Sequence, residues 1–136
     1  MTQANIRSIC GYCGAISGFL AITFGAFGAH ALRSLNGPGQ WESGGASLWQ
    51  TAVLYQMFHA LALLVLAGLP AELISRRVRG WVGGSFTVGT VLFCGSLYLL
   101  AVIRVPLLGM LTPVGGLLLL AGWGVLGIAF WRTSRE

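Results

Sequence analysis

Long apolar stretches alternate along the chain with short segments that carry its charges. The charge-free stretches are residues 8–32, 43–71, 80–103 and 105–131. Each supplies the roughly 20 apolar residues that cross about 30 Å of hydrocarbon as a helix, and none alternates as the strands of a membrane barrel would. The pattern predicts an all-α integral membrane protein, a single bundle of four transmembrane helices. The expected spans are residues 9–32, 48–70, 80–103 and 112–131.

Composition strengthens this prediction by excluding a water-soluble protein. Of the 136 residues, 56% are hydrophobic and 8% are charged, and the mean hydropathy is +0.82. Soluble domains carry about 25% charged residues. A soluble chain of this length also needs polar residues to cover its surface, so the solvent of this chain must be lipid.

The arginines predict how the helices are oriented. Those expected at the same side as the termini are Arg7, Arg76, Arg77, Arg79, Arg132 and Arg135. Only Arg33 and Arg104 fall on the opposite side. Because basic residues near helix ends resist translocation, we expect both termini in the cytoplasm. The net charge of +5 then reflects topology and contact with membrane lipids, and we expect no nucleic-acid partner.

The first expected helix carries small residues along one face. This stripe consists of Gly11, Gly14, Gly18, Ala21, Gly25 and Gly28. Small residues let helix backbones approach closely in lipid, so we interpret the stripe as a tightly packed, Gly-rich face within the bundle. A face for a second protomer is the alternative. The segment also resembles a secretory leader, but its apolar run is longer than a leader core, and we expect it to be retained.

Two local patterns predict where later helices begin. Ser47 and Gln50 have the spacing of a capping box, which favours a helix start at this point. Thr112 followed by Pro113 is typical of an N-cap and a first helical turn. The segment 34–46, rich in glycine, is expected to be an external loop.

Cys10 and Cys13 have the spacing of thiol redox motifs. The expected topology places both at the cytoplasmic end, where thiols are normally kept reduced. No neighbouring lysine or histidine indicates an activated thiol. We therefore interpret both as packing residues and expect no metal site, with redox or metal chemistry as the alternative. Cys94 is interpreted as a core residue.

Uncharged polar residues within the spans form the candidate site, because polar groups in lipid are costly unless they find partners. Alternating helix directions bring these residues into the non-cytoplasmic half of the bundle. They are His30, Tyr55, Gln56, His59, Ser96, Tyr98 and Thr112. One interpretation is interhelical hydrogen bonding. The other is an outward-facing cavity for a small or lipid-like ligand, in which Tyr55 and Gln56 orient the ligand and His59 exchanges a proton.

Several of these residues lie in motifs that resemble a known family. The motifs are Phe24-Gly-Ala-Phe-Gly-Ala-His-Ala-Leu32, Trp49-Gln-Thr-Ala-Val-Leu-Tyr-Gln-Met-Phe-His-Ala-Leu-Ala-Leu-Leu64, Phe93-Cys-Gly-Ser-Leu-Tyr98, Thr112-Pro-Val-Gly-Gly116 and Gly122-Trp123. With these motifs in this order along the sequence, the chain resembles the YgdD/YwdK-like family of small inner-membrane proteins of unknown function. This family includes the animal transmembrane protein 256. The resemblance implies a four-helix protein of the bacterial inner membrane and brings no catalytic or binding residues. Cys10, Cys13 and the segment 34–46 fall outside its pattern.

The remaining residues argue against familiar cofactor and catalytic sites. His30 and His59 differ in expected depth by about 12 Å, too much for axial ligands of one haem, so we expect no cofactor. The chain has no Asp or Lys and no Glu within a span, which argues against acid–base catalysis and transport. We expect a non-enzymatic membrane module that forms a homo-oligomer or associates with another membrane protein.

Overall fold

The computed structural model describes residues 2–28, 44–103, 106–133 and 135. Within these ranges every regular element is helical. The elements are α1 (Gln3–Phe27), α4 (Ala46–Gly68), α5 (Arg76–Ile103), the 3₁₀ helix η3 (Pro106–Met110) and α6 (Leu111–Thr133). The four α-helices are long and apolar enough to cross a membrane, which confirms the predicted all-α architecture of four spans.

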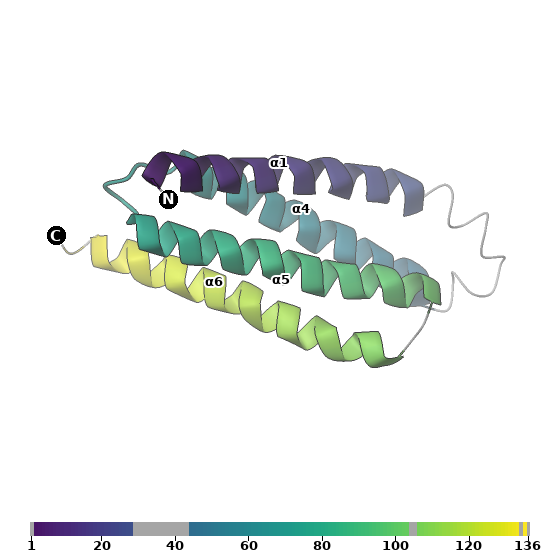
Figure 1. Cartoon of the computed structure of the whole chain (residues 1–136). Coiled ribbons are helices and arrows are strands. Elements are labelled where there is room, and N and C mark those ends of the chain that lie inside the picture. Colours follow the sequence, from purple (N-terminus) through teal and green to yellow (C-terminus); the bar gives the residue numbers. More distant parts are fainter. Residues whose placement is uncertain (1, 29–43, 104–105, 134, 136) are drawn as a thin grey trace.

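The four long helices run side by side along the molecule (Figure 1). Each packs extensively against the helix that follows it, whereas α1 and α5 make a smaller contact. In Figure 1, α1 and α6 lie on opposite edges, and both termini lie at the same end, which we call the terminal end. The terminal end therefore gathers the start of α1, the start of α5 and the end of α6.

Close backbone contacts hold neighbouring helices together. A Cβ atom added to Gly14 of α1 would lie 2.9 Å from the carbonyl oxygen of Ala60 on α4. A Cβ atom added to Gly115 of α6 would collide with the backbone of Phe93 on α5. Because lipid provides no hydrophobic drive between helices, such contacts stabilise the bundle through dispersion over long interfaces. Two of the helix pairs thus depend on glycine.

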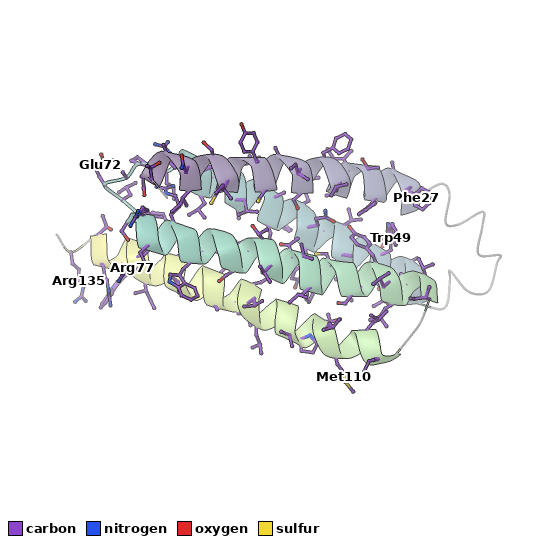
Figure 2. All side chains as sticks on the ribbon, in the orientation of Figure 1. Phe27, Trp49, Glu72, Arg77, Met110 and Arg135 are labelled. Carbon is purple, nitrogen blue, oxygen red and sulfur yellow. The ribbon has the colours of Figure 1, made fainter. Side chains whose placement is uncertain are left out.

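Large side chains fill the space between helices elsewhere. The core nearer the terminal end centres on Leu63, Leu66 and Phe86. Near the opposite end, Trp49 packs against Phe24, Tyr98 and neighbouring apolar residues. Many other large apolar side chains are exposed and project outward from the ribbon (Figure 2). An apolar outer surface of this kind fits a protein whose solvent is lipid.

Two helices begin several residues earlier than the sequence indicates. α1 begins at Gln3 rather than at residue 9, because the Thr2 hydroxyl accepts a hydrogen bond of 3.3 Å from the amide of Asn5. α5 begins at Arg76 rather than at residue 80, and the hydroxyl of Ser75 accepts from the amide of Val78 at 3.4 Å. Charges at these positions do not end a helix, because the exposed arginines can reach polar surroundings. Arg79 is buried and donates to backbone carbonyls instead. The expected end of the first helix and most of the segment 34–46 lie outside the described residues.

Both predicted cap patterns are wrong. α4 begins at Ala46, and its N-cap position has no side-chain cap hydrogen bond, so Ser47 and Gln50 form no capping box. α6 begins at Leu111 and is preceded directly by η3, which places Thr112 inside the helix. The Thr112 hydroxyl contacts Ser96 of α5 instead of capping its own helix.

Candidate functional site

The side chain of Gln56 connects three helices. It is buried on α4, and its amide nitrogen donates to the carbonyl oxygen of Ser17 on α1 at 3.1 Å. Its amide oxygen accepts from the hydroxyl of Tyr98 on α5 at 2.7 Å. A buried amide without partners is costly in an apolar surrounding, so the two hydrogen bonds favour one rotation of α4 relative to α1 and α5.

His59, also buried on α4, has partners at both ring nitrogens. Nδ1 lies 2.8 Å from the carbonyl oxygen of Tyr55, and Nε2 lies 3.1 Å from the indole nitrogen of Trp123 on α6, which donates to it. A carbonyl can only accept, so these partners assign the proton to Nδ1 and leave Nε2 as the acceptor. A second proton on Nε2 would face the Trp123 N–H. The geometry therefore fits a neutral histidine that joins α4 to α6.

A third polar contact joins α5 to α6. The hydroxyl oxygens of Ser96 and Thr112 lie 2.7 Å apart, and the Ser96 hydroxyl also donates to the carbonyl of Phe93 at 2.9 Å. A hydroxyl carries one proton, so Thr112 donates to Ser96 in this arrangement. Both hydroxyls are thereby used within the bundle.

The polar residues predicted from the sequence thus lie in three separate contacts. Gln56 joins α4 to α1 through Ser17 and to α5 through Tyr98. His59 joins α4 to α6, and the Ser96–Thr112 pair joins α5 to α6. Tyr55 is 41% exposed and packs against Phe93 with ring centroids 4.7 Å apart. His30 lies outside the described residues. Sequence reasoning could place these residues in the same half of the bundle, but their partners depend on how each helix is rotated about its axis.

A groove of about 310 Å³ lies between α1 and α5, with α4 contributing to its lining; we call it the α1–α5 groove. Of the predicted site residues, Gln56 and Tyr98 line it. Thr90 of α5 lines it as well, is 7% exposed, and has no hydrogen-bond partner for its hydroxyl among the described residues. Sequence reasoning missed Thr90. The remaining lining is largely apolar and includes Ile16, Leu20, Phe24, Leu63 and Val91.

The small-residue stripe of α1 faces α4. Cβ atoms added to Gly11, Gly18 and Gly25 would lie 3.5 to 3.8 Å from side chains of α4, and Gly14 makes the closer approach to Ala60 described above. Ala21, in the same stripe, is completely buried. A side chain at Gly28 would collide with the Trp49 indole, whose N–H donates to the carbonyl of Phe24 at 2.8 Å. These stripe contacts are all made within one chain.

The three cysteines are free thiols in different surroundings. Cys10 is buried against α5, where a Cβ atom added to Gly83 would lie 2.6 Å from its sulfur. Cys13 lines the α1–α5 groove, and Cys94 is buried on α5. Within the described part of the chain, no group of three His, Cys, Asp or Glu side chains is placed to hold a metal ion.

Arg79 has a structural role that the sequence reasoning missed. Its side chain is completely buried, and it donates to the carbonyls of Leu66, of Leu69 at 2.9 Å and of Pro70 at 3.1 Å. These carbonyls lie at and just beyond the end of α4, where a helix leaves acceptors unpaired. A cation is also favoured at this end of a helix.

Arg7 of α1 completes the same contact from the other side. Its Nε donates to the carbonyl of Ala67 at 2.9 Å, and its Nη2 lies 3.5 Å from the carbonyl of Gly68. Arg7 and Arg79 thus join α1 and α5 to the end of α4. The sequence contained a sign of this role, because Arg79 precedes the buried residues Val82 and Phe86 at helical spacings of three and seven.

Known proteins resemble the chain over most of its length. Residues 24–116 match DUF423, described as a protein of unknown function. The chain is 44% identical over 116 residues to a UPF0382 membrane protein of Staphylococcus epidermidis, which covers 85% of this chain and 89% of that protein. It is 43% identical over 126 residues to the UPF0382 inner membrane protein YgdD of Escherichia coli K12, covering 90% of this chain and 88% of YgdD. No solved structure matches the chain.

Proposed function

The chain belongs to the DUF423 family, with relatives named as membrane proteins, and from this premise we propose that it is a non-enzymatic module of the bacterial inner membrane that acts by association within the membrane. The observation that carries this proposal is the pairing of polar side chains inside the spans. Gln56 with Tyr98, His59 with Trp123, and Ser96 with Thr112 use their hydrogen-bonding groups on one another. Catalysis needs such groups directed at a substrate instead.

We further propose that both termini lie in the cytoplasm. The two termini share one end of the bundle (Figure 1). Arg7, Arg76, Arg77, Arg79, Arg132 and Arg135 belong to that end, and the sequence assigns only Arg33 and Arg104 to the other. This asymmetry is the one that orients bacterial membrane proteins.

The outer face of α6 is the surface we propose for association with a second copy of the chain. α6 packs mainly against α5 and exposes a row of large side chains that includes Leu120, Ile128 and Trp131. Between them, Cβ atoms added to Gly124 and Gly127 would meet nothing within 4 Å. Glycine lowers the stability of a helix, and glycines in membrane helices favour contacts between them. Two copies of α6 packed face to face would use these glycines.

Cross-linking between engineered cysteines tests this surface. Gly124→Cys on α6 and the matched control Leu61→Cys, on the exposed face of α4, are oxidised in native membranes beside the wild-type chain. We expect a covalent dimer for Gly124→Cys that exceeds both controls. A strictly monomeric mass in detergent at all concentrations, together with equal cross-linking of both variants, would contradict the proposal.

Binding of a small amphiphilic ligand is the second candidate function, favoured by the unpaired hydroxyl of Thr90. Thr90 lines the α1–α5 groove together with Gln56, whose amide nitrogen has a second hydrogen to donate. A largely apolar molecule with acceptor oxygens would fit both donors. Native mass spectrometry of the purified protein should then show an adduct that Thr90→Phe removes and Val125→Phe, on the exposed face of α6, retains. An adduct that survives Thr90→Phe, or no adduct on the wild-type chain, would count against this candidate.

A further inference from the structure

A second groove, of about 640 Å³, runs along the exposed side of α5 at the terminal end; we call it the arginine groove. The arginine groove shares no lining residue with the α1–α5 groove. Three helices contribute to its walls. The lining residues are Ile6 of α1, Arg76, Arg77, Gly80, Trp81, Gly84, Ser85 and Val88 of α5, and Leu118 of α6.

The part of the arginine groove nearest the terminal end is basic. Arg76 and Arg77 form the first turn of α5, and both are exposed at the terminal end. The described residues that line the groove include no acidic side chain. A guanidinium group matches a phosphate in charge and in geometry, and the positive end of the helix dipole adds to the attraction. Trp81, one turn further along, is 70% exposed, as is typical of aromatic residues at the headgroup level of a bilayer.

The part of the groove farther from the terminal end is apolar, and no described side chain blocks it. Gly80 and Gly84 lie one turn apart on the same face of α5. A Cβ atom added to Gly84 would meet nothing within 4 Å, and one added to Gly80 would meet only Ile6 at 3.8 Å. Val88 and Leu118 line the groove below the glycines. Side chains at the two glycine positions would occupy the path that leads from the arginines toward Val88.

The length of the groove matches one leaflet of a bilayer. Arg77 and Val88 are separated by 11 residues of helix, which corresponds to about 16 Å at 1.5 Å per residue. The hydrocarbon core of a bilayer is about 30 Å thick, so one leaflet contributes roughly half of that. A lipid whose phosphate lies at the arginines would therefore extend its acyl chain along the glycines to the depth of Val88.

We propose that the arginine groove binds one anionic phospholipid, with its phosphate at Arg76 and Arg77 and an acyl chain over Gly80 and Gly84. Two cationic side chains in the lining favour a lipid with net negative charge over a zwitterionic one. Basic pockets between transmembrane helices are suited to such headgroups. The site lies outside the paired polar residues and is independent of how the chain associates with other proteins.

The proposal is tested by native mass spectrometry of protein released from nanodiscs that contain equal amounts of phosphatidylglycerol and phosphatidylcholine. We compare the wild-type chain with Arg76→Gln/Arg77→Gln, with Gly84→Leu, and with Arg132→Gln/Arg135→Gln as a control of equal charge at the same end. We expect wild type to retain phosphatidylglycerol preferentially. Removal of both groove arginines should reduce that preference about 30-fold, the equivalent of about 1 kcal/mol per arginine.

Each variant tests one part of the proposed site: the path of the acyl chain or the role of the groove arginines. Gly84→Leu keeps every charge but fills the groove, so it should also reduce retention, while the Arg132/Arg135 control should keep the wild-type preference. Equal losses in the control and in the groove arginine variant would overturn the proposal in favour of general surface attraction. The proposal is also overturned if inorganic phosphate stabilises the detergent-solubilised protein as well as short-chain phosphatidylglycerol does, because the site would then need no acyl chain. If a variant fails to fold, a lack of lipid preference in the wild-type chain alone refutes the site.

Discussion

Trp123 of α6 donates a hydrogen bond of 3.1 Å to Nε2 of His59 on α4. The two helices are separated in the chain by the whole of α5. Phe86 of α5 packs edge-on against the His59 ring, with centroids 5.3 Å apart, and also contacts the Trp123 ring at 5.1 Å. Because Nδ1 of His59 is already paired with the carbonyl of Tyr55, the histidine has no ring nitrogen left for a ligand or a proton transfer.

Replacement of His59 should therefore loosen the contact between α4 and α6. We predict that His59→Leu lowers the free energy of unfolding by about 1 kcal/mol, the size measured for hydrogen bonds between membrane helices. Phe58→Leu, at a neighbouring position that is 60% exposed, serves as the control. Reversible unfolding in mixed detergent micelles gives both values, and an equal effect of the two substitutions would show that the histidine contact contributes no stability.

Arg79 should be far more important for stability than its exposed counterparts. It donates to three carbonyls around the end of α4, and hydrogen bonds to charged groups contribute about 1.5 to 3 kcal/mol each. We predict that Arg79→Leu lowers the free energy of unfolding by at least about 3 kcal/mol. Arg132→Leu removes an exposed arginine at the same end and should change it by less than about 0.5 kcal/mol. Similar values for both would mean that Arg79 acts only as a surface charge.

Two glycines should respond in opposite directions to the same substitution. Gly14 lies close to the backbone of Ala60, whereas an added Cβ at Gly127 would meet no atom within 4 Å. We predict that Gly14→Ala destabilises the bundle by about 1 to 3 kcal/mol, because α1 must move away from α4. Gly127→Ala should instead stabilise the monomer by up to about 1 kcal/mol, since alanine is the better helix former. Unfolding titrations at low protein concentration compare them, and destabilisation of the same size at both positions would contradict the close packing of α1 on α4.

The orientation of the chain can be tested with thiol labelling. If the termini are cytoplasmic, Glu72→Cys in the segment between α4 and α5 should resist a membrane-impermeant thiol reagent in intact cells. Gly37→Cys, in the segment that follows the first span, should react readily. The asymmetry of arginines is the physical reason for this expectation. The reverse labelling pattern would place the termini outside.

The number and class of the helices could be predicted from the sequence because charge and hydropathy directly reflect the solvent of each segment. Four charge-free stretches indicate four spans, and the described part of the chain contains four such helices. Helix starts are harder to predict, because the arginines suggest span ends although Arg79 is buried within α5. A charge marks a membrane boundary only when its side chain faces water, and the sequence alone does not report which side chain does.

The sequence predicts which polar residues share one half of the bundle, but not how they pair. The sequence predicts Gln56 and Tyr98 in the same half of the bundle, and the structure joins them directly. Thr112 was interpreted as a cap, yet its hydroxyl contacts Ser96 on another helix. Trp123 was not expected to contact His59, since that contact depends on the rotation of α4 and α6 about their own axes. Rotation is determined by packing across the whole bundle, which no single helix encodes.

We infer that polar side chains inside the spans serve to join helices. The hydrogen bond between Gln56 and Tyr98 tests it most directly, because both partners are side chains and each can be removed alone. A double-mutant cycle of Gln56→Leu and Tyr98→Phe measures their coupling in the free energy of unfolding. We predict a coupling of about 0.6 to 1.7 kcal/mol in favour of the folded bundle, whereas fully additive effects would contradict the claim.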